Sequence, residues 1–167
     1  MEDWIYNDKK ISTIGDFPED TYGFVYKITN LTKGKVYYGK KKLVSTRNKY
    51  IAKSTYDKLR KKGDKTISRR KSKKKSTKKN IVWNYRKEER KETNWKKYVG
   101  SNKQLKKDFK KGDRILREIL YLCKNETDMN FYETRAIICS DCFEMNKDCY
   151  NEWHKVILRK DALSKNK

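Results

Sequence analysis

The sequence is poor in proline, in histidine and in long apolar runs. Its 167 residues include one proline, Pro18, and one histidine, His154. It has no apolar run of about 18 residues, which argues against a membrane-spanning helix. The chain begins Met1-Glu2-Asp3-Trp4, which is acidic and has no apolar stretch. We therefore expect no signal peptide and a cytoplasmic protein.

Positive charge, in contrast, is abundant. The chain has 45 Lys or Arg and 22 Asp or Glu, a net charge of +23, and its hydrophobic content of 35% allows only a small core. The length suggests one compact domain, and an aromatic content of 13% argues against full disorder. A charge of this size indicates a polyanionic partner, with nucleic acid favoured over an anionic membrane.

The positive charge is concentrated in the middle of the chain. Residues 48–94 contain 19 Lys or Arg and 5 Asp or Glu, a net charge of +14. Within them, residues 68–80 (SRRKSKKKSTKKN) have no apolar side chain, so we expect this stretch to be disordered without a ligand. Apolar residues return at Ile81, Val82, Trp83 and Tyr85, where we expect a short helix. We interpret the whole stretch as a basic insertion.

The sequence before the insertion predicts a β-hairpin. Between Tyr22 and Ile28 (YGFVYKI), aromatic and β-branched residues alternate onto one face. The next segment has the composition of a turn, with Gly34 suited to a positive φ angle. Lys35 to Gly39 (KVYYG) predicts the second strand.

The sequence after the insertion predicts a helix, a strand and a second helix. Ser101 and Gln104 form a capping-box pattern at the start of a helix that ends at Gly112. Residues 115–122 are apolar enough for a central strand. The second helix should start near Thr127, with an apolar face made of Tyr132, Ala136, Cys139 and Phe143. These elements predict a small α/β (α+β) domain with a three-stranded, mainly antiparallel sheet flanked by helices.

Six short elements occur in a recognisable order. They are Val25-Tyr26, Tyr37-Tyr38-Gly39, Asn94 to Ser101 (NWKKYVGS), Leu116 to Leu120 (LREIL), Tyr132 to Arg135 (YETR) and Tyr150-Asn151. Together they resemble the GIY-YIG nuclease family, in particular its phage-borne, free-standing homing endonucleases. Phe24 and Tyr38 depart from the usual motifs but leave Tyr26 and Tyr37 in place.

The resemblance implies a catalytic set. Its members are Tyr26, Tyr37, Arg47, Glu133 and Asn151, with Tyr26 as general base, Tyr37 orienting water or phosphate, and Glu133 as the ligand of Mg²⁺ or Mn²⁺. Magnesium is commonly held by one or two carboxylates plus substrate oxygens, and an arginine fork suits phosphate. A tyrosine base needs its pKa of about 10 lowered, and we expect neighbouring cations to do this.

Taken singly, each of these residues has an ordinary structural interpretation. Tyr26 and Tyr37 fit as strand aromatics, Glu133 as a solvated helical residue, and Asn151 as a turn residue. Arg47 fits as one backbone-contacting cation among many. Their co-occurrence in order is what favours a nuclease site.

We expect a second group of residues to contact DNA. Cations should bind phosphates and give an affinity that falls steeply with salt. The insertion has few groups suited to reading bases, so we expect much of the binding to be sequence-tolerant. The expected contacts are Lys40, Lys41, Lys42, Arg69, Arg70, Lys73, Lys74, Lys75, Trp95, Tyr98 and Ser101.

The four cysteines offer a rival site. Without an export signal we expect reduced thiols. Cys139, Cys142, Cys149 and His154 have the residue types of a tetrahedral zinc site. Their spacing differs from that of common zinc knuckles, and Cys139 belongs to a predicted apolar face. Core packing is therefore favoured, and zinc is the less favoured cofactor.

The sequence thus predicts a metal-dependent endonuclease that hydrolyses double-stranded DNA, has no membrane partner, and acts in the cytoplasm of an infected bacterium if phage-encoded. One alternative is a catalytically inactive DNA- or RNA-binding protein on the same fold. Another is a restriction or genome-degrading nuclease. The expected organisation is an N-terminal extension at 1–20, a GIY-YIG-like nuclease domain at 21–158 with its insertion at 48–94, and a basic tail at 159–167.

Overall fold

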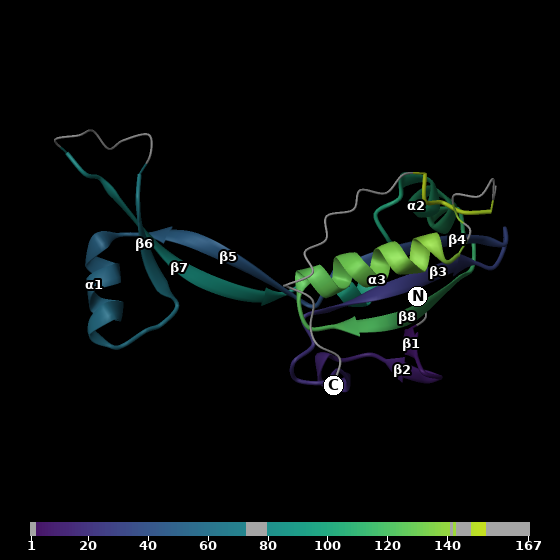
Figure 1. Ribbon diagram of the computed structural model, residues 1–167, viewed down its shortest axis with the longest axis horizontal. Helices are drawn as coiled ribbons and strands as arrows, with labels where there is room; N and C mark the ends of the chain where they lie inside the picture. Colours follow the sequence, from purple (N-terminus) through teal and green to yellow (C-terminus); the bar gives the residue numbers. More distant parts are fainter. Residues whose placement is uncertain (1–2, 73–79, 141, 143–147, 153–167) are drawn as a thin grey trace. The chain divides into compact units, whose positions relative to one another are not determined.

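The structure of the protein is a computed structural model that describes residues 3–72, 80–140, 142 and 148–152. The chain forms two compact units, a core unit of residues 1–43 and 93–167 and an inserted unit of residues 44–92 (Figure 1). The core unit is closed where the insertion leaves it, because the N–H of Thr93 donates to the carbonyl of Leu43 at 2.9 Å.

The core unit is built on a five-stranded sheet with the order β2-β1-β8-β3-β4. Strand β3 pairs antiparallel with both β4 and β8, while β1 pairs parallel with β8. The predicted α+β class is confirmed, and β8, expected to be central, lies between β1 and β3. The strands are β1 (Trp4–Tyr6), β2 (Lys9–Ile11), β3 (Gly23–Asn30), β4 (Lys35–Lys42) and β8 (Ile115–Cys123).

The N-terminal residues belong to this sheet and are more than an extension. Trp4 on β1 is fully buried, and its indole N–H donates to the carbonyl of Trp95 at 2.9 Å. The ring of Trp4 also packs edge-on against Phe24 and Tyr26, with centroids 5.1 and 5.2 Å apart. The strand-pair signal in residues 4–11 was missed because each strand has only three residues.

Strand β3 is buried on both faces. Phe24 and Tyr26 join the aromatic cluster with Trp4, whereas Val25 points to the other face and packs with Met129 of α3. Figure 1 shows α3 (Glu126–Ile138) running along the sheet. A strand in this position needs apolar or aromatic side chains at successive positions, which the sequence of β3 supplies.

The helices of the core unit begin at asparagine caps. Helix α2 (Lys103–Lys110) starts after Asn102, whose Oδ1 accepts from the N–H of Leu105 at 2.9 Å. The predicted cap at Ser101 is therefore wrong by one residue. Asn125 caps α3 in the same way, and Asp128 in its first turn suits the positive end of the helix dipole. The two 3₁₀ turns are η1 (Ile14–Asp16) and η2 (Trp95–Lys97).

Two expectations about the cysteines are corrected. Cys139 is exposed at the end of α3, and Met129 and Ile137 are the buried apolar residues of this helix instead. Of the expected apolar face, Tyr132 and Ala136 do pack against the core, and Phe143 lies outside the described residues. Cys142 and Cys149 form a disulfide, where reduced thiols were expected.

A short segment near the C-terminus pairs with the free edge of β4. Val36 forms a parallel bridge with Cys149, and the N–H of Tyr150 donates to the carbonyl of Val36 at 2.8 Å. The hydroxyl of Tyr150 donates to Asp108 of α2 at 2.8 Å and accepts from the buried amide of Asn30 at 2.9 Å. Tyr150 thereby links α2 to the end of β3.

The inserted unit is a second sheet with the order β5-β7-β6 and one helix. Its elements are β5 (Val44–Ile51), α1 (Lys53–Lys61), β6 (Ile67–Lys71) and β7 (Trp83–Glu92). The expectations of disorder from residue 68 and of a helix at 81–85 are therefore wrong at 68–71 and 83–85. Pairing with β7 satisfies the backbone of these polar strands even though they bury little. Residues 73–79 lie outside the described part of the chain.

The carboxylate of Asp108 predicts a specific acid sensitivity. The Lys33 ammonium, 2.6 Å away, and the hydroxyl of Tyr150 help to hold the pKa of Asp108 at about 2, against its ordinary value of 3.8. A lowered carboxyl pKa stabilises the fold above pH 4, and this contribution is lost as the pH falls towards 2. We expect Asp108→Asn to be less stable at pH 6 and to lose less further stability between pH 4 and 2. The midpoints of urea unfolding at pH 6, 4 and 2 measure these changes, and Asp3→Asn, at an exposed position, is the control. An equal loss of stability between pH 4 and 2 in Asp108→Asn and in wild type would contradict the prediction.

Candidate active site

A pocket of about 810 Å³ lies along β4 in the core unit. Its lining brings together five of the residues predicted from the sequence, Tyr37, Lys40, Ser101, Glu133 and Asn151. Tyr37 comes from β4, Ser101 from the loop before α2, Glu133 from α3 and Asn151 from the segment that pairs with β4. Residues separated by more than a hundred positions therefore meet at one sheet edge.

Tyr26 lies against the backbone of Gly39, directly across the strand pair. A Cβ at Gly39 would meet the Tyr26 hydroxyl at 2.5 Å and its Cζ at 2.7 Å. The Tyr26 side chain is only 1% exposed, so it cannot move aside. The glycine of the second motif is therefore required by the tyrosine of the first.

Tyr37 is held by a second close glycine. Its hydroxyl is hydrogen-bonded to Ser101 at 2.6 Å. Gly100, at φ +83°, leaves the Tyr37 ring so near that a Cβ there would meet its Cε1 at 2.9 Å. The backbone of Gly100 thus packs against the Tyr37 ring, and the Ser101 side chain holds the Tyr37 hydroxyl.

Glu133 is paired with a lysine of the edge strand. Its carboxylate lies 2.9 Å from the Lys40 ammonium, which also donates to the Oδ1 of Asn130 at 2.5 Å. Asn130 and Glu133 are three residues apart on α3, so both oxygens face the same way. Lys40 was predicted to contact DNA, and its contact with Glu133 was not foreseen. The usable signal was its place next to Gly39 on the strand that carries Tyr37.

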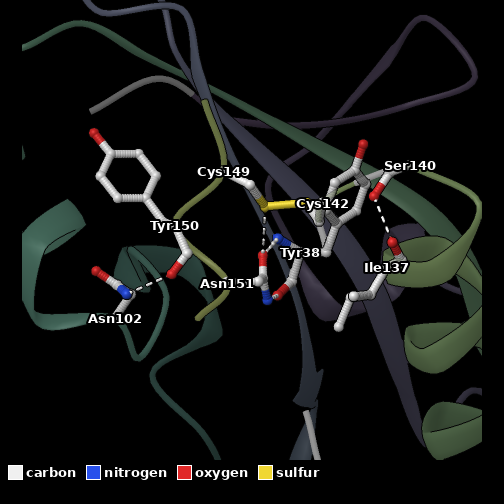
Figure 2. The surroundings of a disulfide bond; sticks show 8 residues. All are labelled: Tyr38, Asn102, Ile137, Ser140, Cys142, Cys149, Tyr150 and Asn151. Carbon is white, nitrogen blue, oxygen red and sulfur yellow. Dashed lines mark hydrogen bonds between the residues drawn. A yellow bond between two sulfur atoms is a disulfide. The ribbon is translucent and has the colours of Figure 1, made fainter. Parts of the chain in front are cut away.

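Asn151 fastens the segment near the C-terminus to β4. Its amide oxygen accepts from the N–H of Tyr38 at 2.8 Å, and its amide nitrogen donates to the Tyr38 carbonyl at 2.9 Å. Figure 2 shows this two-point contact beside the Cys142–Cys149 disulfide, with Asn102 reaching the carbonyl of Tyr150. Both ends of the Asn151 amide are therefore used on the backbone of the strand.

The pKa of Tyr26 is shifted in the direction opposite to the one expected from the sequence. Burial raises the pKa of Tyr26 well above its usual value, and the neighbouring Tyr37, Tyr98 and Glu133 push the same way. Tyr26 is also hydrogen-bonded to Tyr98, whose own pKa is raised by burial. Neighbouring cations were expected to lower the pKa of Tyr26. They do not, because burial dominates and the charged or hydroxyl groups that act on Tyr26 all raise its pKa.

Several other predicted site residues have different surroundings. Arg47 belongs to β5 of the inserted unit, opposite Glu89, and is not among the pocket-lining residues. Trp95 is fully buried, so its predicted contact with DNA is corrected to a core role. Tyr98 is half-buried, and the Lys41 ammonium lies 4.0 Å from the centroid of its ring.

The remaining predicted DNA contacts are cations. Lys42 lies 2.5 Å from Glu126. Arg69 and Arg70 are exposed on β6, and Arg69 stacks on Trp83. Lys73, Lys74 and Lys75 lie outside the described residues.

The rival zinc site loses two ligands to the disulfide between Cys142 and Cys149. His154 lies outside the described residues, which contain no cluster of three or more His, Cys, Asp or Glu suited to a metal. Within the same residues, none of the helices has the length and apolar character needed to cross a bilayer.

Comparison with known families identifies the class of domain to which this fold and pocket belong. The family model described as "Putative endonuclease segE, GIY-YIG domain" matches residues 4–156, nearly the whole chain. The chain therefore belongs to this family of GIY-YIG endonuclease domains, whose substrate is nucleic acid. Comparison with curated proteins and with solved structures gives no significant match.

The contact between Tyr26 and Gly39 can be tested by adding one methyl group. We expect Gly39→Ala to destabilise the core unit by about 1–3 kcal/mol, because the buried ring has no space to yield. Urea unfolding measures the loss. Gly15→Ala is the matched control, since the atom nearest to its Cβ would be 3.8 Å away. Equal stability of the two variants would show that the Tyr26 ring can move.

Proposed function

We propose that the protein is a metal-dependent endonuclease that hydrolyses double-stranded DNA, with a homing-type role. The carrying observation is that Glu133, Lys40, Tyr37 and Ser101 converge on one pocket, with Tyr26 packed behind Gly39. The family match supports nuclease chemistry. The homing-type role is supported by the resemblance of the sequence motifs to those of free-standing phage enzymes.

The oxygen atoms around Lys40 suit a divalent cation. The Lys40 ammonium lies between the Glu133 carboxylate and the Asn130 amide oxygen, two hard donors of the kind that Mg²⁺ and Mn²⁺ prefer. We assign Glu133, with Asn130, as the residues that would hold the ion. When bound, the ion supplies positive charge that acidifies water and offsets charge on phosphate.

The residues of the chain divide the remaining work. Tyr37 and Ser101 line the pocket with their hydroxyls hydrogen-bonded to each other, which leaves one hydroxyl proton of the pair to donate to a phosphate oxygen. Lys103 and Lys107 on α2 line the same pocket, so we assign them the phosphate-binding role that the sequence gave to Arg47. Asn151 holds the strand edge on which Tyr37 sits.

Tyr26 is the proposed proton acceptor, and its role depends on Glu133. The negative charge of Glu133 is one cause of the raised pKa of Tyr26. A cation held at Glu133 cancels that contribution and favours the phenolate. Proton transfer by Tyr26 and ion binding by Glu133 are thus linked in this proposal.

The assignment of Glu133 is tested by cleavage of supercoiled plasmid and phage DNA with Mg²⁺ or Mn²⁺. We expect wild type to cut, chelator to abolish cutting, and Glu133→Gln to lose at least about 100-fold. The matched control is Glu126→Gln, since Glu126 lies on the same helix and also pairs with a lysine of β4 but does not line the pocket. It should cut at nearly the wild-type rate.

Two outcomes would oppose the proposal. A Glu133→Gln variant that cuts like wild type would remove Glu133 from the mechanism. Wild-type protein that binds DNA but cuts none with either metal would favour the inactive nucleic-acid binder on the same fold.

The role of Tyr26 predicts a pH dependence. Because its pKa is raised, the phenolate fraction and the cleavage rate should increase steadily from pH 6 to 9. We expect Tyr26→Phe to lose roughly 100-fold or more and to flatten this dependence. Its DNA affinity should be unchanged, and Tyr132→Phe on α3 is the control. A Tyr26→Phe enzyme with a wild-type pH profile would exclude Tyr26 as the proton acceptor.

A further inference from the structure

The lysines of the inserted sheet all lie on one of its two faces. Side chains alternate between faces along each strand, and the register assigns directly paired residues to the same face. One face, which we call the arginine face, has Arg70, Arg86 and Arg90 as its cations and also carries the carboxylates of Glu88 and Glu92. Its central members are Asn48 and Tyr50 of β5, Ser68 and Arg70 of β6, and Asn84 and Arg86 of β7.

The opposite face carries every lysine of the three strands. They are Lys49, Lys71, Lys87 and Lys91, and two arginines, Arg47 and Arg69, lie on the same face. This lysine face also forms the packing surface of the unit, because Tyr56 of α1 is buried against Tyr85 with ring centroids 4.9 Å apart. Within the described residues of the inserted unit, α1 is the one helix, and it packs on the lysine face and leaves the arginine face without a helix.

The confinement of the lysines to one face suits the two tasks of DNA recognition. Lysine acts as a point charge suited to phosphates, which fix position without reading sequence. Arginine and asparagine form paired hydrogen bonds with the major-groove edges of guanine and adenine. The arginine face has both kinds of base-reading side chain on neighbouring strands. The more basic lysine face and α1 lie on the other side, where they can meet phosphates.

The guanidinium of Arg86 lies near the centre of the arginine face, where Tyr50 fixes its position. It lies on the middle strand, 5.0 Å from the ring centroid of Tyr50, and its Nη2 donates to the Tyr50 hydroxyl at 3.0 Å. Tyr50 itself is 63% exposed. Farther along the same face, Arg90 is turned to Glu88 at 3.0 Å, so Arg86 and Arg70 are the stronger candidates for contacts with bases.

We propose that the arginine face reads bases in the major groove of double-stranded DNA, with Arg86, Arg70, Asn48 and Asn84 as specificity-determining residues. This rests on the proposed DNA substrate and adds to it, since the insertion was expected to bind mainly without regard to sequence. Strands are known to enter the major groove in this manner. Duplex RNA is disfavoured, because its major groove is too deep and narrow for side chains to read.

The experiment is selection of bound sequences from a randomised DNA duplex library. The full chain is used in the Glu133→Gln background, so that cleavage cannot remove bound DNA and binding is scored independently of catalysis. The test variant is Arg86→Lys, which keeps the charge but loses the fork. The matched control is Lys87→Gln, at the adjacent position on the opposite face. Thermal unfolding verifies that each variant is folded.

We expect the parent protein to enrich a defined motif that contains guanine. Arg86→Lys should lose preference at one position, by roughly 5- to 100-fold, and keep its salt dependence. Lys87→Gln should select the same motif. Loss of one phosphate contact at Lys87 should reduce the slope of log affinity against log salt concentration by about 0.9. The proposal would be overturned if Arg86→Lys and the double variant Asn48→Ala/Asn84→Ala both selected the same DNA motif as the parent protein. So would absence of any motif, or equal competition by duplex RNA.

The result separates the two proposals. An enzyme that cuts DNA in the wild-type form but enriches no motif would disprove base reading and leave the nuclease assignment intact. A chain that selects a motif but never cuts DNA would support base reading and disprove the nuclease assignment.

Discussion

The close packing of Tyr26 on Gly39 is the constraint on which the core unit depends. A full aromatic side chain at one position of β3 fits only because its partner on β4 has no side chain. That fit brings the Tyr26 ring within 6.2 Å of Tyr37 and 6.1 Å of Tyr98, measured between centroids. The same ring closes the aromatic cluster that contains Trp4, so the stability of the fold and the placement of the hydroxyls have one origin.

The position of β4 at the edge of the sheet explains how the pocket is assembled. Tyr37 and Gly39 share a face with Tyr26, while Lys40, opposite Val25, points to the face covered by α3. Groups on opposite faces of a central strand would be separated by the sheet. At an edge strand they can meet around the rim, and Asn151 covers the edge only as far as Tyr38.

The parts predicted from sequence are those whose signals are local. Alternation in residues 22–28, the glycines at 34 and 112, and the apolar run at 115–122 each specify their own segment. Tyr37, Ser101 and Glu133, which line one pocket, were predicted as site residues because their order along the chain resembles that of a known family. The raised pKa of Tyr26 and the contact between Lys40 and Glu133 depend on packing across the sheet, which no local pattern reveals. The second sheet was missed because polar strands satisfy their backbones in pairs while burying little.

The hydrogen bond between Leu43 and Thr93 has a consequence for how such a protein can diversify. The 49 residues of the inserted unit leave and re-enter the core at adjacent points. The inserted unit is therefore equivalent to a single loop of the core, with its two ends held together by the hydrogen bond between Leu43 and Thr93. The entropic cost of closing a loop grows only slowly with its length. The unit can therefore be shortened, extended or exchanged at little cost to the core. If the proposed roles hold, base reading by the inserted unit and cleavage by the core unit can change independently within one chain.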